Sequence, residues 1–167
     1  MLDKFLTLIL LTLLPGLELR LSIPVGILEN TIHLPFGLVF QGFGLPWYTV
    51  FLVCVVTNAV LGPVIYFLLD KFVLFFLRFQ WINGLWQRLV ARTQRKIKPF
   101  VERYGKIGVA LFIAIPLPGS GSWTGALAAY LLGIKPKHFV LINVAGVFIA
   151  GVLVTLASLG AFTLFPV

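Results

Sequence analysis

The sequence predicts an all-α integral membrane protein, and three observations support this fold class. Apolar residues make up 60% of the 167 positions and charged residues 11%, whereas soluble domains carry roughly a quarter charged residues. Mean hydropathy is +1.06. Residues 46–69 and 138–162 are each long and apolar enough to cross a bilayer as one helix. Two further apolar stretches, 1–28 and 107–134, are interrupted by proline and glycine.

The interrupted stretches predict hairpins that enter and leave the membrane on the same side. Each places Leu-Pro-Gly between two short apolar runs, and a run of about ten to twelve residues forms a helix of only ~15–18 Å, half a membrane. Each is followed by a full-length apolar stretch with one asparagine in its first half, Asn58 and Asn143. We therefore expect two repeats of hairpin and crossing helix. Because each repeat crosses once, the second is inverted, and the two hairpin turns are expected to meet near the midplane.

Positive charge predicts the orientation. Nine of the thirteen Lys and Arg residues fall within 71–106, and Lys135 and Lys137 follow the second interrupted stretch. If both stretches are hairpins, these basic segments share one side, which the positive-inside rule places in the cytoplasm. Full crossings would instead place Lys135 and Lys137 opposite the linker. We therefore expect a multi-pass cell-membrane protein with a cytoplasmic linker (70–106) and both termini outside.

The linker is expected to form an amphipathic helix on the lipid surface. Arg88, Arg92 and Arg95 share one helical face, and Lys96 and Lys98 add positive charge. Each basic residue near anionic lipid adds about 1 kcal/mol of attraction. A solvated anchor that only fixes topology explains the same pattern. We therefore expect the net charge of +8 to orient the protein in the membrane and to attract anionic lipid, and we expect no nucleic-acid partner.

The first hairpin turn supplies the charged candidates for a substrate or ion site. Glu18 and Arg20 lie two and four residues past the Pro15-Gly16 break, and each charge would cost about 2.5–3.5 kcal/mol in the middle of a lipid-facing helix. Ionisable residues within membranes are usually functional, and a proton on Glu18 is expected to accompany an anionic group. The alternative is structural, with Glu18 capping the second half-helix and Arg20 neutralising it.

The second turn is uncharged and could bind through its backbone. Its glycines allow close approach, its serines are expected to cap the following half-helix, and half-helix N-termini favour an anionic group. The candidate residues are Pro118, Gly119, Ser120, Gly121, Ser122, Trp123 and Thr124. A tight packing joint is the alternative. Asn58 and Asn143 are expected to bond carbonyls that the turns leave free, or to act only in helix packing. No metal-ligand spacing and no nucleophile–base pair occurs in the sequence, so no metal, cofactor or enzymatic activity is expected.

Two segments carry a family resemblance, "PGLELRLSIPVGI" and "RYGKIGVALFIAIPLPGSGSWTGALAAYLLGI". Together they resemble the small multi-drug export family of bacterial and archaeal membrane proteins, over nearly the whole chain. That family is similar in turn to the DedA-like (SNARE-associated, VTT) superfamily. The resemblance implies two opposed re-entrant hairpins, with Glu18 and Arg20 as the acidic–basic signature of the first and Pro118-Gly119 in the second. DedA-like proteins carry further charged residues that the second turn here lacks.

A small secondary transporter of an anionic or amphipathic solute is the leading functional expectation. A lipid flippase or scramblase of DedA-like type is the second, because the basic linker and interfacial aromatic residues suit lipid handling. A membrane scaffold without transport is the third, and it predicts that Glu18 and Arg20 tolerate alanine. Two crossing helices and two hairpins are few segments with which to enclose a transport pathway, so a homodimer is expected.

Overall fold

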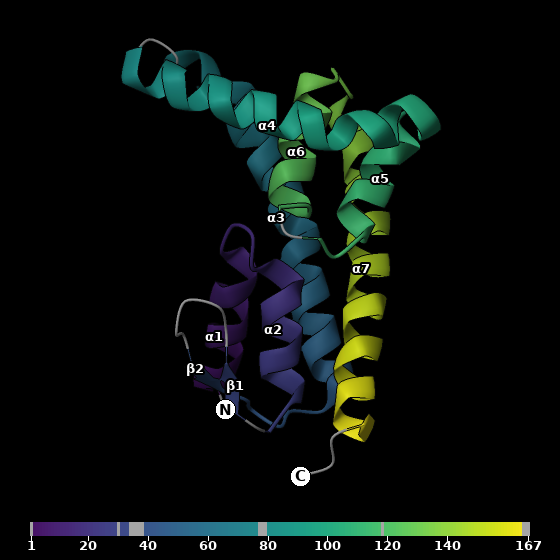
Figure 1. The fold of residues 1–167 in the computed structure, drawn as a ribbon. Helices are drawn as coiled ribbons and strands as arrows, with labels where there is room; N and C mark the ends of the chain where they lie inside the picture. The colour runs from purple at the N-terminus through teal and green to yellow at the C-terminus, as the bar shows by residue number, and fades with distance from the viewer. Residues whose placement is uncertain (1, 30, 34–38, 77–79, 118, 165–167) are drawn as a thin grey trace. The chain divides into compact units, whose positions relative to one another are not determined.

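A computed structural model of the chain describes residues 2–29, 31–33, 39–76, 80–117 and 119–164. Within these ranges the regular secondary structure is helical apart from one short two-stranded sheet (Figure 1). The elements in chain order are α1 (Leu2–Leu13), α2 (Glu18–Ile27), β1 (Thr31–His33), β2 (Val39–Gln41), α3 (Trp47–Phe76), α4 (Gln80–Tyr104), α5 (Ile107–Ala114), α6 (Ser122–Leu131) and α7 (Pro136–Leu164).

Two of the helices, α3 and α7, are long and apolar enough to cross a membrane. Their membrane-compatible segments are Trp47–Lys71 and Pro136–Gly160, with mean hydropathies of 2.2 and 2.5. These segments agree with the predicted crossings at 46–69 and 138–162. The helix of the first crossing continues to Phe76, beyond the point where the basic linker was expected to begin.

Helix breaks occur where the sequence predicts them. Helix α1 ends at Leu13 and α5 ends at Ala114, each two residues before a proline (Pro15 and Pro116). A proline disfavours the helical conformation of the residue before it, and Ile115 is accordingly extended, with ψ 120°. The four half-length helices α1, α2, α5 and α6 contain 12, 10, 8 and 10 residues, so each measures about 12–18 Å.

The chain divides into two compact units, residues 1–58 with 148–167 (unit 1) and residues 59–147 (unit 2). In unit 1, α1 and α2 pack side by side (Figure 1). Their apolar contact comprises Leu11, Leu21 and Val25, with Leu17 and Phe43 packed against it. Glycine allows α2 to approach α3 closely, because a Cβ on Gly26 would lie 2.5 Å from Val50 Cγ1.

Unit 1 also contains the two strands, which the sequence did not predict. β1 and β2 pair antiparallel, with Ile32 opposite Phe40. Each strand has only three residues, which is shorter than the roughly four to eight residues over which strand alternation can be recognised in a sequence. The all-α prediction is therefore right for the helical framework and incomplete for this connection.

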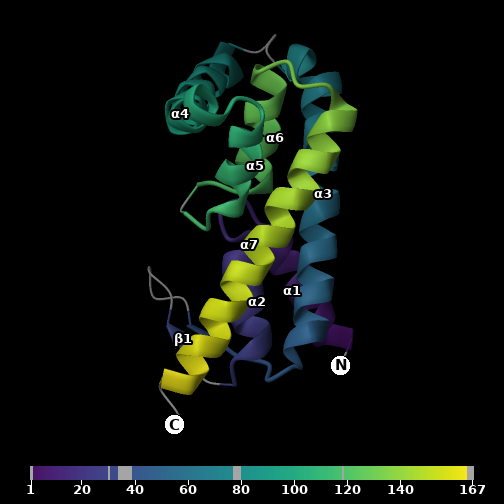
Figure 2. The ribbon, with the colours of Figure 1, turned by 90° about the vertical axis from the view of Figure 1, so that its right-hand side faces the viewer.

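In unit 2, α4 packs against α5 and α6, and α5 packs against α6 (Figures 1 and 2). Glycines again mark the close contacts, since a Cβ on Gly125 would lie 2.5 Å from Ile113 Cγ1 and one on Gly146 would lie 2.8 Å from the Ala110 carbonyl oxygen. The start of α7 is fixed to the later part of α3 by Tyr66, whose ring stacks on Phe139 at 5.2 Å.

Candidate functional site

The first hairpin turn, residues 14–17, presents a buried carboxylate at its end. Gly16 adopts φ +86°, a left-handed conformation in which a side chain would be strained. Glu18, the first residue of α2, has φ +42°; no other non-glycine residue in the described ranges has a positive φ. Its side chain is 4% exposed. Pro15 and Gly16 themselves are exposed, so they shape the turn and Glu18 carries its chemistry.

Asn58 holds this carboxylate in unit 1. Its Nδ2 donates a hydrogen bond to Glu18 Oε2 at 3.1 Å, and both side chains are buried. The guanidinium of Arg20, which is half-buried, interacts electrostatically with Glu18. The structure thus brings together three residues that the sequence singled out separately. A buried carboxylate, an amide donor and a nearby guanidinium can accept a proton or bind an ion or an anionic group.

Three buried residues that the sequence did not single out as binding candidates extend this group. Thr12, Ser22 and Cys54 are buried residues of α1, α2 and α3, and the Cys54 thiol lies beside the side chains of both hydroxyl residues. The hydroxyls also donate to carbonyls four residues earlier, Thr12 to Leu8 at 2.7 Å and Ser22 to Glu18 at 3.0 Å. We call Thr12, Glu18, Ser22, Cys54 and Asn58 the polar seam of unit 1.

One spacing in the sequence hinted at the polar seam. Cys54 and Asn58 are four residues apart, so they lie on the same face of a helix. Thr12 shares its apolar run with Thr7, and no spacing distinguishes Thr12 or Ser22 from hydroxyl residues that simply bond their own helix.

The second hairpin turn, in unit 2, is closed by the Ser120 side chain. Ser120 Oγ donates to the Ile115 carbonyl at 2.6 Å, contacts the Leu117 carbonyl at 2.9 Å and accepts from the Leu117 N–H at 3.2 Å. Gly119 and Gly121 have φ +78° and +117°, which only glycine adopts readily. Pro118 lies outside the described residues.

The expected capping of α6 by serine is wrong. The N-cap position is Gly121, which makes no side-chain capping bond, and Ser120 is engaged in closing the turn. Ser122 is the buried first residue of α6, Trp123 is half-buried, and the Thr124 hydroxyl lies 3.4 Å from the Gly121 carbonyl. The backbone conformation of Gly121 thus starts this helix where a capping side chain was expected.

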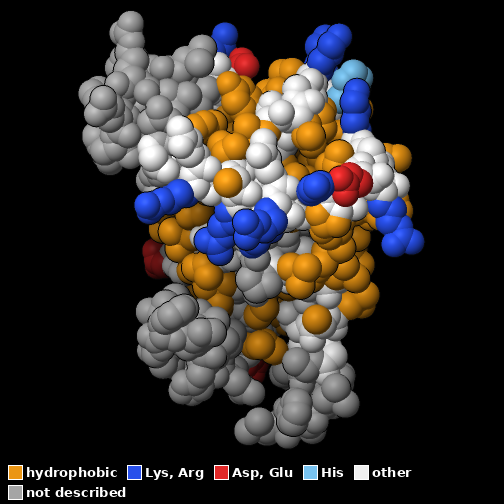
Figure 3. Space-filling model, turned by 45° about the horizontal axis from the view of Figure 1, so that its top comes forward, with side chains coloured by type: hydrophobic (Ala, Val, Ile, Leu, Met, Phe, Trp, Pro, Cys, Tyr) orange, Lys and Arg blue, Asp and Glu red, His pale blue; other side chains and the backbone are white. Residues whose placement is uncertain are grey.

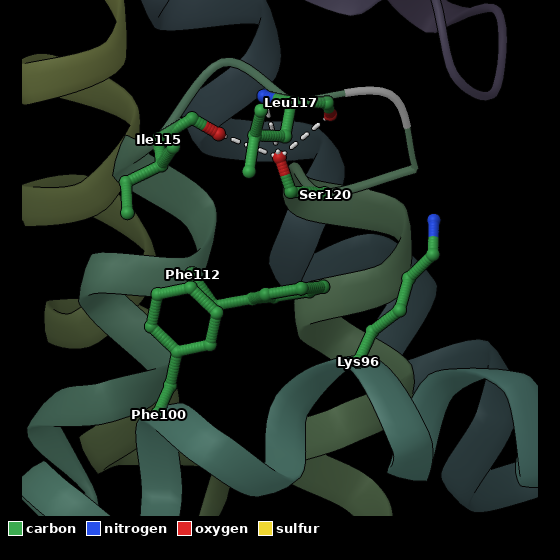
Figure 4. A pocket seen from close by; sticks show the side chains of 6 residues that line it. All are labelled: Lys96, Phe100, Phe112, Ile115, Leu117 and Ser120. Atoms are coloured by element: carbon green, nitrogen blue, oxygen red, sulfur yellow. Dashed lines mark hydrogen bonds between the residues drawn. The ribbon is translucent and has the colours of Figure 1, made fainter.

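A lysine from α4 reaches the second turn. Lys96 Nζ lies so close to Gly119 that a Cβ on that glycine would overlap it. Below the turn is a cavity of about 150 Å³ (Figure 4), lined by Lys96, Phe100, Phe112, Ile115, Leu117 and Ser120. The turn that is uncharged in sequence therefore has a cation beside it, supplied from another helix.

Helix α4 places its remaining basic candidates differently. Arg88, Arg92, Arg95 and Lys98 are exposed, whereas Thr93 and Ile97 on the same helix are buried. Figure 3 shows Lys and Arg side chains (blue) among hydrophobic (orange) and other (white) surface on this face of the molecule. Lys96 is half-buried and lies beside the apolar stripe formed by Ile97 and Phe100. Its place beside this apolar stripe distinguishes Lys96 from Arg88, Arg92, Arg95 and Lys98, with which the sequence analysis grouped it.

Asn143 connects the two long helices within unit 2. Its Nδ2 donates to the Ala59 carbonyl at 3.1 Å. That carbonyl lies four residues before Pro63, which lacks the N–H that would normally bond it in a helix. Gly62 makes room, because a Cβ there would overlap the Asn143 amide. Asn143 was expected to bond a carbonyl freed by a hairpin turn, whereas the carbonyl that it bonds belongs to α3. The predicted meeting of the two hairpin turns involves different units and stays a prediction.

The chain was compared with protein families, curated proteins and solved structures. A protein-family model described as "putative small multi-drug export protein" matches residues 18–153. No curated protein and no solved structure matches the chain.

Proposed function

The chain belongs to the small multi-drug export family, and on this premise we propose that it is a secondary membrane transporter of an anionic or amphipathic solute. One observation carries the proposal, the buried Glu18 carboxylate at the end of a half-length hairpin, held by Asn58 and beside Arg20. A carboxylate within a membrane is costly and is usually retained for a function. Glu18 exchanges a proton during transport, and Arg20 attracts the anionic group of the solute.

The first hairpin is re-entrant in this proposal, and contacts within unit 1 support it. Both of its ends bond the segment directly before α3. Lys4 Nζ, near the start of α1, donates to the Phe43 carbonyl at 3.0 Å, and the Phe43 N–H donates to the Val25 carbonyl, near the end of α2, at 2.8 Å. The turn end, by contrast, bonds Asn58, eleven residues after the first residue of α3. Eleven helical residues rise about 17 Å, close to half the thickness of the hydrocarbon core.

The second hairpin has matching features within unit 2. Its far end bonds α3, where Tyr66 Oη donates to the Ile134 carbonyl at 2.7 Å, and the Tyr66 ring stacks on Phe139 near the start of α7. Near its turn end, Ala110 and Ile113 of α5 contact Gly146, ten residues after the first residue of α7. Ten residues correspond to about 15 Å of helix. Two hairpins that each follow one long helix to half its depth support an inverted repeat with the basic linker in the cytoplasm.

Labelling tests this topology. In a Cys54→Ala background, single cysteines are introduced by Lys137→Cys and Arg92→Cys, both at exposed positions, and intact cells are treated with a membrane-impermeant maleimide. We expect both to be protected until the membrane is permeabilised, because hairpins place them on the cytoplasmic side together. Labelling of the Lys137→Cys variant in intact cells, with the Arg92→Cys variant protected, would contradict the re-entrant second hairpin.

Proteoliposomes test the transport step at Glu18. Uptake of carboxyfluorescein, an amphipathic anion, is followed with and without an inward proton gradient. We expect the gradient to accelerate uptake in the unaltered protein. Glu18→Gln should abolish this acceleration, because a glutamine amide does not take up or release a proton as a carboxylate does. Glu29→Gln, at an exposed carboxylate of the same unit, is the matched control. Normal gradient-driven uptake by the Glu18→Gln variant would refute the role of this residue.

Lipid movement is the second candidate function, and the exposed basic residues of α4 favour it because they attract anionic headgroups. The same liposomes can carry fluorescent NBD-labelled phosphatidylglycerol, which dithionite quenches only in the outer leaflet. Quenching of the inner-leaflet lipid without any ion gradient would favour a scramblase, and protection of that lipid together with gradient-driven dye uptake would favour a transporter.

A further inference from the structure

The cavity beneath the second hairpin turn combines one cation with an apolar wall. Lys96 extends from α4 along one side of it toward the turn (Figure 4). Four of the other five lining residues, Phe100, Phe112, Ile115 and Leu117, are apolar. We propose that this cavity is a binding site for an amphipathic anion, in which the Lys96 ammonium pairs with a carboxylate or phosphate and the apolar wall holds the adjoining aromatic or short alkyl group.

The charge of the lining residues selects an anion. Among the residues that line the cavity, Lys96 is the ionisable one, and the remaining polar group, the Ser120 hydroxyl, is engaged with the carbonyls of Ile115 and Leu117. An ammonium group has three N–H donors, so Lys96 can contact the turn and still donate to a ligand. Glu102, the acidic residue nearest to it in the sequence of α4, forms an ion pair with Lys98 at 3.7 Å and does not line the cavity.

The size of the cavity limits the apolar part of the ligand. A volume of about 150 Å³ equals that of engineered apolar cavities that bind benzene. Phe100 and Phe112 meet edge to face, with centroids 5.7 Å apart and planes at 68°, and provide a rigid wall for a ring. Leu117 is 54% exposed at the rim, which leaves an entrance. A ring, or a chain of about six carbons, next to the anionic group fits this space.

Lys96 is not needed to hold the second hairpin turn in place. Ser120 already closes the turn with three short contacts. Lys96 nevertheless lies among apolar side chains, and Gly119 is needed to admit its ammonium group. Arg95, the neighbouring residue, is exposed and offers a control with the same change of charge.

Binding of para-fluorobenzoate tests the site. The full-length protein in phosphatidylcholine nanodiscs is titrated, and binding is followed by fluorine NMR line broadening. We expect saturable binding that Lys96→Gln weakens by at least about tenfold, the loss of one charge-assisted hydrogen bond, whereas Arg95→Gln leaves it unchanged. The neutral para-fluorobenzyl alcohol should bind more weakly than the anion. No saturable benzoate binding, equal binding of the alcohol, or equal effects of the two substitutions would overturn the proposal.

Two further arms keep the outcome clear. Lys96→Arg retains the charge and should preserve saturable binding. Gly119→Ala should weaken benzoate binding although Lys96 is intact, because the added methyl group displaces the ammonium group. Retained affinity in a folded Gly119→Ala variant would overturn the assignment of Lys96. Phosphatidylglycerol in the nanodiscs separates two sources of the anion. Competition with benzoate would assign the site to a lipid headgroup, and unchanged benzoate affinity would assign it to soluble anions. Binding is measured without transport, so the result is independent of the test at Glu18.

Discussion

Replacing Asn143 by alanine should destabilise the protein in a way that depends on Pro63. The Asn143 amide donates to the Ala59 carbonyl at 3.1 Å, and Pro63 provides no N–H for that carbonyl. Losing the donor leaves a half-buried carbonyl unsatisfied. A fully buried unsatisfied group costs about 1–3 kcal/mol, and hydrogen bonds between membrane helices measure about 0.6 kcal/mol on average. The substitution also removes Asn143 Oδ1, which has no hydrogen-bond partner within the described residues. We therefore expect a net loss of about 1 kcal/mol.

A double-mutant cycle isolates this bond. In a Pro63→Ala background the new backbone N–H can donate to the Ala59 carbonyl, so Asn143→Ala should then cost about 1 kcal/mol less than in the unaltered protein. Pro63→Ala alone should be neutral or stabilising, because proline in a helix interior is unfavourable. The exposed neighbour Val144 supplies the control, since Val144→Ala should show no dependence on the background.

Reversible unfolding by SDS in mixed micelles, followed by far-UV circular dichroism, measures the four free energies. The cavity that alanine leaves and the removal of Oδ1 are common to both backgrounds, so they cancel in the cycle. Equal losses for Asn143→Ala in the two backgrounds, within about 0.5 kcal/mol, would refute the view that Asn143 compensates for the proline.

Three further substitutions or treatments test the packing within each unit. Gly26→Ala should destabilise unit 1 by about 1–3 kcal/mol, because its Cβ would lie 2.5 Å from Val50 Cγ1, and Val50→Ala should restore much of the loss in thermal unfolding. Tyr66→Phe should cost about 1 kcal/mol, the hydrogen bond to the Ile134 carbonyl, in the same SDS titration; no loss would count against that bond. Cys54, the single cysteine and fully buried, should react with a membrane-permeant maleimide only after unfolding, and rapid labelling of the native protein would contradict the closed polar seam.

The helical framework was predictable because its signals are local. Proline and glycine interrupt α1–α2 and α5–α6 within apolar runs, and the uninterrupted runs form α3 and α7. These features depend on backbone geometry and on the length of apolar segments, both of which are written in consecutive residues. The strands β1 and β2 escaped prediction because three residues are too few to show a period.

The candidate site was only partly predictable. Glu18 stands out because a charge within an apolar run is conspicuous, and Asn58 because it is the polar amide in a crossing helix. Their hydrogen bond joins residues 40 positions apart, and no sequence pattern in a single chain specifies such a pairing. The sequence grouped Lys96 with the residues expected to face lipid, because charge alone does not show which face of α4 is covered by α5 and α6.

The sequence by itself determined that this chain is a membrane protein with two long apolar helices and two interrupted ones, because transfer from water to lipid is a sum over residues. Only the tertiary structure decided which polar groups meet: Asn58 with Glu18, Asn143 with the carbonyl that Pro63 leaves free, and Lys96 with the turn at Gly119. These contacts depend on direction and distance between helices, which hydropathy and charge counts do not contain.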